Sequence, residues 1–384
     1  MNPIGLAPGV HTEDVFPPLP PTLPTGVPAF LGTAAAGPPN VPVAVTHWSR
    51  FQEVFGAGTG YLGAAVAGFF GNDGLMCWVV RLDDGRPAVP ALRAGLAALS
   101  DVDDVDLVCV PDAVGAPTAT GRPDVAAAVA LQAEVLADCR RAGGRFAVLD
   151  AVPALVRGPV EEQRAGLSGA DGALYHPWLL VSDVDGTARY VPPCGHVAGA
   201  YSRSDQRWGV HKAPANEPLD GVLDLMADCT DADIGALYAQ QVNCLRDRPG
   251  RGIRVWGART LSADPVWQQV TARRVVGTTG RWLRRFLDDL TYEPNDLRLW
   301  VRVTREVTAY LDGMFARGAF AGATAAESYY VKCDAETNPP DVLAAGLVVT
   351  QVGLALRAPA EFVVVRVVHG AGGVTVEPTN TPTR

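Results

Sequence analysis

The hydrophobic and polar positions of the chain follow two different periods. Through the first two thirds, short apolar runs alternate with longer segments in which apolar residues recur every three or four positions. Buried strands that alternate with helices are typical of a largely parallel α/β sheet, because parallel strands need long crossover connections. The expected strands span residues 28–33, 41–45, 77–82, 105–110, 146–152 and 178–181.

Helices are expected at residues 47–55, 62–70, 124–141 and 231–238. The clearest of them, 124–141, begins at an aspartate and ends with two arginines, which is the arrangement that the helix dipole favours. By contrast, residues 190–221 show no regular period and are expected to be loop-like. Long irregular stretches in compact domains are often functional or interfacial.

The last third has its own organisation, which we expect to begin near residue 250. An amphipathic helix is predicted there, because apolar residues are spaced by three and four positions from Trp300 to Met314. Asn295 is its expected N-cap and Gly318 its expected C-terminal cap. The other expected elements are strands at 253–260, 270–273 and 328–333, a helix at about 275–290, and a hairpin of 346–356 with 361–368.

The predicted fold class is therefore α/β, with an α+β unit at the end of the chain. The predicted domains are a largely parallel α/β domain at 28–249 and a smaller one at 250–369. Two arms, 1–27 and 370–384, flank them. The first arm is rich in proline and must be extended, and both arms carry a short β-capable segment. Such segments are suited to pairing with a sheet outside their own body.

Composition excludes some functions. The chain has 384 residues, 48% of them hydrophobic, and a net charge of −9, so we do not expect it to bind nucleic acid or an anionic membrane electrostatically. No apolar run approaches the length of a membrane span, and the N-terminus lacks the features of a signal peptide. The seven widely spaced cysteines are expected to be free thiols in a reducing cytosol.

Three patterns suggest chemistry, and each also has a structural explanation. The glycines of Gly58-Thr-Gly60-Tyr-Leu-Gly63 fit a dinucleotide loop, but a helix-like segment precedes them instead of a strand, so no cofactor is expected. Cys194, His196 and His211 lack a further ligand at useful spacing, so no metal is expected. The third pattern is a set of aspartates at the ends of expected strands: Asp112, Asp150 and Asp183.

Ligands bind at the carboxyl ends of parallel strands, and carboxylates there can hold a metal or transfer protons. Aspartates are also common in turns, where they accept hydrogen bonds from backbone N–H groups. The turn explanation is favoured, and an α/β hydrolase or nucleotide-binding enzyme that uses Asp112 and Asp150 is the alternative. Arg281, Arg284 and Arg285 lie on one side of an expected helix, which is either a solvated face or a docking face for a protein partner.

A series of short motifs then points to a family. In chain order they include Ala7-Pro-Gly-Val10, Pro24-Thr-Gly-Val-Pro-Ala-Phe-Leu-Gly32, Lys212-Ala-Pro-Ala-Asn216, Trp256-Gly-Ala-Arg-Thr-Leu261, Glu293-Pro-Asn295, Gly318-Ala-Phe-Ala-Gly322, Val331-Lys-Cys-Asp334 and Pro359-Ala-Glu-Phe362. Together and in this order, the motifs resemble the tail sheath proteins of contractile phages and of related contractile injection particles. The resemblance extends over nearly the whole chain.

The resemblance implies a structural protein without catalysis or a cofactor. Sheath proteins of this family stack as hexameric rings around an inner tube, exchange strands with neighbouring subunits, and contract to drive the tube through a target envelope. The implied partners are copies of the chain, an inner tube protein, and baseplate and terminator or cap proteins, with no nucleic acid and no insertion into a membrane. Assembly is expected in the cytoplasm of the producing bacterium, before the particle is released as a virion tail or tail-like particle.

Three groups of residues follow from this interpretation. Strand exchange is expected to involve Val10, Thr12, Phe362, Val364, Val374 and Val376. The side chains proposed to face the tube are Arg281, Arg284 and Arg285. Arg259, Glu293 and Asn295 are expected to brace the C-terminal domain.

Overall fold

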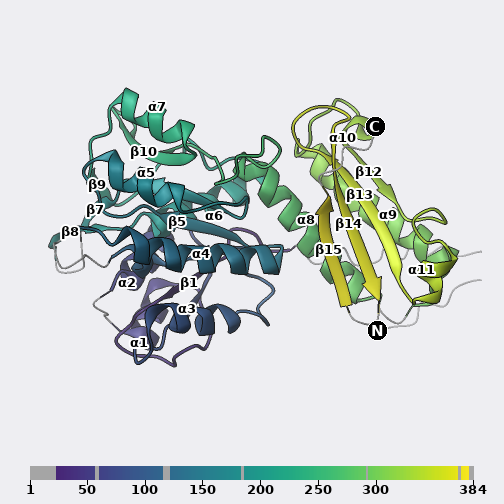
Figure 1. Ribbon diagram of the computed structural model, residues 1–384, viewed down its shortest axis with the longest axis horizontal. Coiled ribbons are helices and arrows are strands. Elements are labelled where there is room, and N and C mark those ends of the chain that lie inside the picture. Colours follow the sequence, from purple (N-terminus) through teal and green to yellow (C-terminus); the bar gives the residue numbers. More distant parts are fainter. Residues whose placement is uncertain are drawn as a thin grey trace, which may run out of the picture.

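The computed structural model describes residues 23–56, 60–115, 122–182, 186–290, 293–370 and 373–379. Within these ranges the chain forms a larger unit and a smaller C-terminal unit. The long helix α8 (Val270–Asp288) connects them (Figure 1).

An eight-stranded sheet is the centre of the larger unit. Its order is β11-β10-β6-β5-β4-β1-β3-β2. The inner pairs are parallel, and β2 and β11 are antiparallel to their neighbours at the two edges. The strands are β1 (Pro28–Gly32), β2 (Val43–Val45), β3 (Cys77–Arg81), β4 (Leu107–Cys109), β5 (Phe146–Asp150), β6 (Gly172–His176), β10 (Val242–Arg248) and β11 (Gly252–Trp256).

Helices cover both faces of this sheet, because successive side chains of a strand point to opposite faces. In β1, Phe30 packs into the core on one face, whereas Ala29 and Leu31 pack into the core on the other. The first core is shared by α1 (Trp48–Phe55), α2 (Leu62–Gly71) and α6 (Cys194–Trp208). The second is shared by α3 (Ala88–Ala97), α4 (Val125–Ala142), α5 (Arg157–Ala165) and α7 (Asp231–Ala239).

Two further elements complete the larger unit. A short 3-10 helix, η1 (Pro111–Val114), follows β4. A three-stranded antiparallel sheet of order β8-β7-β9 packs on the first core. Its strands are β7 (Leu179–Ser182), β8 (Ala188–Val191) and β9 (Val222–Leu225).

The C-terminal unit is a four-stranded antiparallel sheet of order β12-β13-β14-β15 (Figure 1). Its core combines the inner face of this sheet with α9 (Leu297–Ala316) and with the second half of α8, including Leu283 and Leu287. The remaining elements are β12 (Tyr329–Lys332), β13 (Val348–Ala355), β14 (Phe362–Gly370), β15 (Gly373–Thr379), α10 (Ala325–Ser328) and α11 (Pro340–Ala344).

The α/β fold class is confirmed, as are the strands β1, β3, β4 and β5, the helices α2, α4, α7 and α9, and the hairpin of β13 with β14. The predicted C-terminal cap of α9 agrees with the structure, because Gly318, two residues after the last residue of the helix, has a φ of 79°. Its N-cap is one residue from the prediction. Asp296, and not Asn295, accepts from the backbone N–H groups of the first turn.

The prediction that residues 190–221 form a loop was wrong for the first half of this stretch. Residues 194–208 form α6, and its residues from Cys194 to Asp205 are all buried. The helix was missed because it is rich in glycine, alanine and serine and so has no apolar stripe. The small residues are required by packing: a Cβ on Gly195 would lie 2.1 Å from the carbonyl oxygen of Ala65 in α2.

The boundary near residue 250 was also wrong. Residues 249–250 lie in the turn between β10 and β11, which are paired in the same sheet from Cys244–Trp256 to Arg248–Gly252. Residues 252–256 therefore belong to the larger unit. The segment 270–273 was predicted as a strand but forms the first turn of α8. The prediction failed because this part of the helix is buried on all sides, so its sequence shows no helical period. Finally, the strand at 178–181 is antiparallel and lies outside the large sheet.

Candidate functional site: the junction and the sheet edges

The first half of α8 is held in the larger unit by a buried cluster of charges. Arg274 donates to both oxygens of Asp205 at 2.8 and 2.6 Å and to Asp106 at 2.8 Å. All three side chains are at most 4% exposed. Asp106 also accepts from the backbone N–H groups of Gly26 and Val27, at 3.1 and 2.7 Å. One carboxylate thus binds both the helix that leads to the C-terminal unit and the segment that enters β1.

The charges of this cluster depend on one another. Burial raises the pKa of Asp205, and the positive charge of Arg274 opposes that rise. Burial by itself would lower the pKa of Arg274, but Asp205 and Asp106 raise it overall, so the guanidinium stays protonated. A buried pair of this kind is sensitive, because removing one partner leaves an uncompensated charge out of contact with water.

Two more arginines of α8 bind the larger unit. Arg273 pairs with Asp171 at 2.6 Å. Arg281 is 7% exposed and donates to the backbone carbonyls of Pro24, Asp103 and Asp104. Arg281 therefore does not belong to an exposed face, which corrects its predicted role as a tube-facing residue.

The other two predicted tube-facing residues differ from Arg281. Arg284 is partly exposed and Arg285 is exposed. Both follow Arg281 on α8, where the helix leaves the larger unit. Their placement is compatible with docking, and nothing in the subunit itself assigns them a partner protein.

The signal for this cluster was present in the sequence but was not used. Asp106 interrupts the apolar run Val105-Asp106-Leu107-Val108, and Arg273 and Arg274 interrupt the run from Val270 to Val276. A charged residue inside a buried run must have a partner, since an isolated buried charge is very unfavourable. What the sequence could not provide was the pairing, because Asp106 and Arg274 are 168 residues apart.

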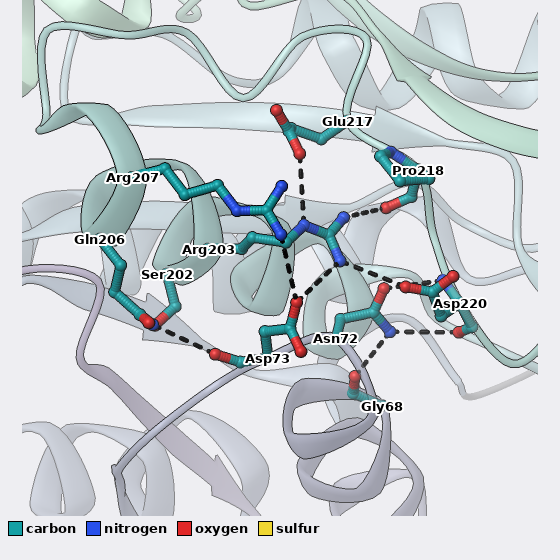
Figure 2. Close-up of polar contacts among 10 residues, drawn as sticks. All are labelled: Gly68, Asn72, Asp73, Ser202, Arg203, Gln206, Arg207, Glu217, Pro218 and Asp220. Carbon is teal, nitrogen blue, oxygen red and sulfur yellow. Dashed lines mark hydrogen bonds and ion pairs between the residues drawn. The ribbon is translucent and has the colours of Figure 1, made fainter.

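A second network covers one edge of the large sheet (Figure 2). Arg203 of α6 is 3% exposed and lies among three carboxylates, at 3.2 Å from Glu217, 3.2 Å from Asp220 and 3.6 Å from Asp73. It also donates to the carbonyl of Pro218. Arg203 thereby holds the segment 217–220 against α6.

Asn72, at the end of α2, reinforces this network. Its amide donates to Gly68 and to the carbonyl of Asp220, and it accepts from the N–H of Asp220 at 2.8 Å. The segment held in this way pairs with β11. The N–H of Asn216 donates to Val255 at 2.7 Å, and the N–H of Leu219 donates to Ile253 at 2.9 Å. The outer edge of β11 is therefore covered by the chain itself.

The C-terminal sheet is different, because no described strand pairs with the outer edge of β12 or of β15. β14 is an inner strand, paired with β13 on one side and β15 on the other. Phe362 and Val364 lie on β14, so within the subunit they are not on an edge strand. Val374 and Val376 do lie on an edge strand. In the subunit, however, β15 pairs with its own β14, and Val376 packs near Gly280 of α8. Val10 and Thr12 lie outside the described residues.

The three predicted bracing residues occupy different places. Arg259 stacks on Tyr238 at 4.0 Å, and its N–H donates to the side chain of Asn243, so it braces the larger unit and not the C-terminal one. Asn295 donates to the carbonyl of Leu347 at 2.9 Å and accepts from the indole N–H of Trp300 at 2.9 Å, which fixes the start of α9 beside β13. Glu293 is exposed and pairs with Arg302 at 3.1 Å.

The aspartates of the enzyme alternative bind backbone groups. Asp112 accepts from the N–H and hydroxyl of Thr33 and from the N–H of Tyr61, at 2.6–3.0 Å. Asp150 accepts from the N–H of Cys194, the first residue of α6, at 2.7 Å. Burial raises the pKa of Asp150 to about 7. Both carboxylates thus have structural partners, but these lie on other elements and not in the local turns that were expected.

The residues considered as metal ligands are also part of the packed structure. Cys194 and His196 lie in the buried helix α6, and burial lowers the pKa of His196 to about 4. Over the residues that the structure describes, no cluster of three or more histidine, cysteine, aspartate or glutamate side chains is placed to hold a metal. None of the described helices combines the length and apolar character needed to cross a membrane. Gly58 and Asp183 lie outside the described residues.

Solved structures define the class of protein to which this geometry belongs. The chain is similar to the helical sheath of the anti-feeding prophage (AFP) in its contracted state, with 26% identity, a TM-score of 0.72, and coverage of 94% of this chain and 98% of that one. It is equally similar to the sheath complex of an extracellular contractile injection system, PVC, in its contracted state (26% identity, TM-score 0.74, coverage 94% and 96%). A chain of the AFP baseplate also matches, with 26% identity, a TM-score of 0.74 and coverage of 93% and 97%.

Sequence comparisons give the family. Residues 88–261 match the phage tail sheath protein central domain. The tail sheath protein of Salmonella phage ViI is 26% identical over 182 residues, which is 46% of this chain and 28% of that protein. The tail sheath protein of Burkholderia phage BcepMu is 27% identical over 204 residues, 50% of this chain and 41% of that protein. The matches thus span less than half the length of these two relatives. Residues 88–261 therefore match the central domain of phage tail sheath proteins, and nearly the whole chain is similar to the sheath structures of contractile injection systems.

Proposed function

We propose that this chain is the repeating unit of a contractile sheath, stacked as hexameric rings around an inner tube, and that contraction of the sheath drives the tube through a target envelope. The observation that carries the proposal is the contrast in sheet edges. The larger unit covers its β11 edge with residues 216–219, whereas no strand among the described residues pairs with the outer edge of β12 or of β15. Unpaired edges are templates for strand addition.

The proposed connection between subunits is strand addition at this sheet. The segment around Val10 and Thr12 of one subunit would add to an open edge of a neighbour, and β15, with Val374 and Val376, would supply or receive a strand. The buried charges around Arg274 support this role, since they fix α8 and hence the sheet relative to the larger unit. Forces applied to the sheet edge would then reach the whole subunit.

Electron microscopy of the purified chain tests the proposal. We expect hollow, striated tubes of a helical stack. Deleting residues 1–20 should prevent tube formation but leave circular dichroism and the unfolding transition close to those of the full chain. Tubes that form equally well without residues 1–20 would contradict the proposed part of the N-terminal segment. A stable monomer under all conditions that assemble related sheaths would contradict self-assembly itself.

The proposed partners are the inner tube protein, the baseplate and a terminator protein, and assembly would take place in the producing cell. Arg285 is the most exposed of the predicted tube contacts. We expect Arg285→Glu to weaken co-assembly with the tube protein without changing sheath assembly alone. Arg298→Glu, on the exposed start of α9, is a matched charge reversal. Equal loss from both variants would remove Arg285 as a specific contact.

We also propose that the chain is not an enzyme. Asp112 and Asp150, the residues of the hydrolase alternative, are both used as acceptors for backbone N–H groups. A turnover assay with esters and nucleoside triphosphates should give no rate above background. Activity that disappears in Asp112→Asn while the protein stays folded would restore the enzyme alternative.

A further inference from the structure

A cavity of about 600 Å³ lies near the junction of the two units, between α3, α4 and the part of α8 that carries Arg281 and Arg284. Four arginines line it, Arg141, Arg145, Arg281 and Arg284, together with two aspartates, Asp103 and Asp138. The lining thus carries two positive charges in excess, whereas the whole chain has a net charge of −9. We call this space the junction cavity.

The positive charges of the junction cavity are held in place but are not fully neutralised. Arg145, which is 9% exposed, donates to the carbonyls of Leu99 and Val102. Arg281 is held by backbone carbonyls in the same way. Carbonyl groups fix the direction of a guanidinium without cancelling its charge. Burial lowers the pKa of Arg281, and the charges of Arg274 and Arg145 lower it further, against the opposing effect of Asp106 and Asp104.

The carboxylates of the junction cavity do not balance the four guanidinium groups. Asp138 is shared by Arg141 at 2.6 Å and Arg145 at 3.3 Å. Asp103 makes no ion pair within the described residues. Arg284 makes no hydrogen bond or ion pair there either, and its guanidinium lies close to Gly143, at the end of α4. One wall of the cavity is apolar and is made by Leu96, Ala97, Val102 and Val105.

We propose that the junction cavity binds a small organic phosphate with two or more phosphate groups. Guanidinium groups match the oxygens of phosphate in pairs, and their binding is strongest where water is partly excluded. The volume lies within the range of small-molecule sites, and the apolar wall would contact the organic part of the ligand. Arg141 and Arg145 belong to the larger unit and Arg284 to the connecting helix. A bound phosphate would therefore link the two units and stiffen their junction.

Inorganic pyrophosphate is the probe for the charged part of the ligand, titrated by calorimetry into the full chain at low ionic strength. We expect saturable binding that weakens as salt is added, because partly exposed charges are screened. Arg284→Gln should lower the affinity at least about tenfold, because it removes a charge-assisted hydrogen bond to the phosphate. Asp103→Asn should raise the affinity, because it removes a negative charge from the lining.

Arg285→Gln is the matched control, because Arg285 is the next residue of α8, has the same charge, and does not line the cavity. It should leave the affinity unchanged. No saturable binding, or equal losses in Arg284→Gln and Arg285→Gln, would overturn the proposal. If Arg284→Gln impairs assembly while pyrophosphate does not bind, the cavity receives carboxylates of a neighbouring copy and the proposal is wrong. The titration needs no assembled particle, so its outcome is separate from that of the proposed sheath function.

Discussion

The large sheet and the C-terminal sheet differ at their outer edges. The large sheet covers the outer edge of β11 with residues 216–219, which are held by Arg203 and Asn72. In the C-terminal sheet, no described strand pairs with the outer edge of β12 or β15. Within the described residues, the chain therefore covers the β11 edge of its large sheet with its own polar network and leaves both edges of the C-terminal sheet without a strand partner.

This difference separates two tasks. The larger unit uses buried ion pairs and close helix packing, which give one defined arrangement. The C-terminal unit uses an apolar core beneath a sheet whose outer edges have no strand partner among the described residues. The cluster of Arg274, Asp106 and Asp205 joins the two, because α8 is anchored in the closed unit and forms part of the core of the open one.

The largest expected effect is on this anchor. Arg274→Ala leaves Asp106 and Asp205 buried without their partner, and we expect it to lower the free energy of unfolding by about 3–5 kcal/mol. Denaturation with urea, followed by circular dichroism, measures this change. Arg305→Ala is the control on α9, since Arg305 is 68% exposed, and it should change stability by less than about 0.5 kcal/mol. Equal effects would show that the cluster does not anchor α8.

The next expected effect is on the pH dependence of the free energy of unfolding, through the buried Asp150 of the larger unit. The pKa of Asp150 is raised by burial from 3.8 to about 7. Between these values the folded state holds a proton that the unfolded state has lost. Stability therefore falls as the pH rises from about 4 to 7, by at most about 1.4 kcal/mol per pH unit from this group.

Asp150→Asn should remove this dependence, because asparagine keeps an oxygen that can accept from the N–H of Cys194 and has no proton to lose in this pH range. The variant should be more stable than the natural chain at pH 8, and the difference should shrink toward pH 4. Unfolding curves at several pH values measure it. Parallel pH profiles for the two proteins would contradict the assignment.

A smaller effect is expected from the contact between α2 and α6. Gly195→Ala would place a Cβ 2.1 Å from the carbonyl oxygen of Ala65, so we expect a loss of about 1–3 kcal/mol. Gly313→Ala is the matched substitution on α9, where a Cβ meets nothing within 4 Å. It should stabilise the chain by about 0.5–1 kcal/mol, the gain in helix propensity. Thermal unfolding of the two variants should give shifts of opposite sign.

The smallest effect is local. Arg203→Gln should loosen residues 209–221 and expose the edge of β11, with little change in global stability. Hydrogen exchange of the amides of Asn216 and Leu219 measures it, because both donate to β11. Unchanged protection of these amides would show that Arg203 does not keep the large sheet closed.

Sequence patterns predicted the elements that depend on local periodicity. The buried strands β1 and β5 were found because they are short, almost wholly apolar runs. Helix α9 was found because its apolar residues form one stripe. Helix α6 was missed because its packing uses small residues against α2, which leave no apolar stripe. The start of α8 was missed because it is buried on all sides, so its apolar run resembles a strand.

The candidate site was predictable only in part. The edge strand with Val374 and Val376 was found because a short apolar run follows a glycine-rich segment. The charge cluster was not, since Arg274 meets Asp205 and Asp106 through contacts between residues 69 and 168 positions apart. Residues far apart in the chain meet only through the fold, and no local pattern encodes which aspartate an arginine will reach.

The most direct test of the account is truncation of the open edge. A chain that ends after Gly370 lacks β15, whereas a chain that ends after Thr379 keeps it. We predict that the shorter chain folds, as shown by circular dichroism and a cooperative unfolding transition, but forms no tubes in electron micrographs, and that the longer chain retains β15 and folds like the full protein. Tubes formed by the chain that ends after Gly370 would contradict the claim that this sheet edge joins the subunits.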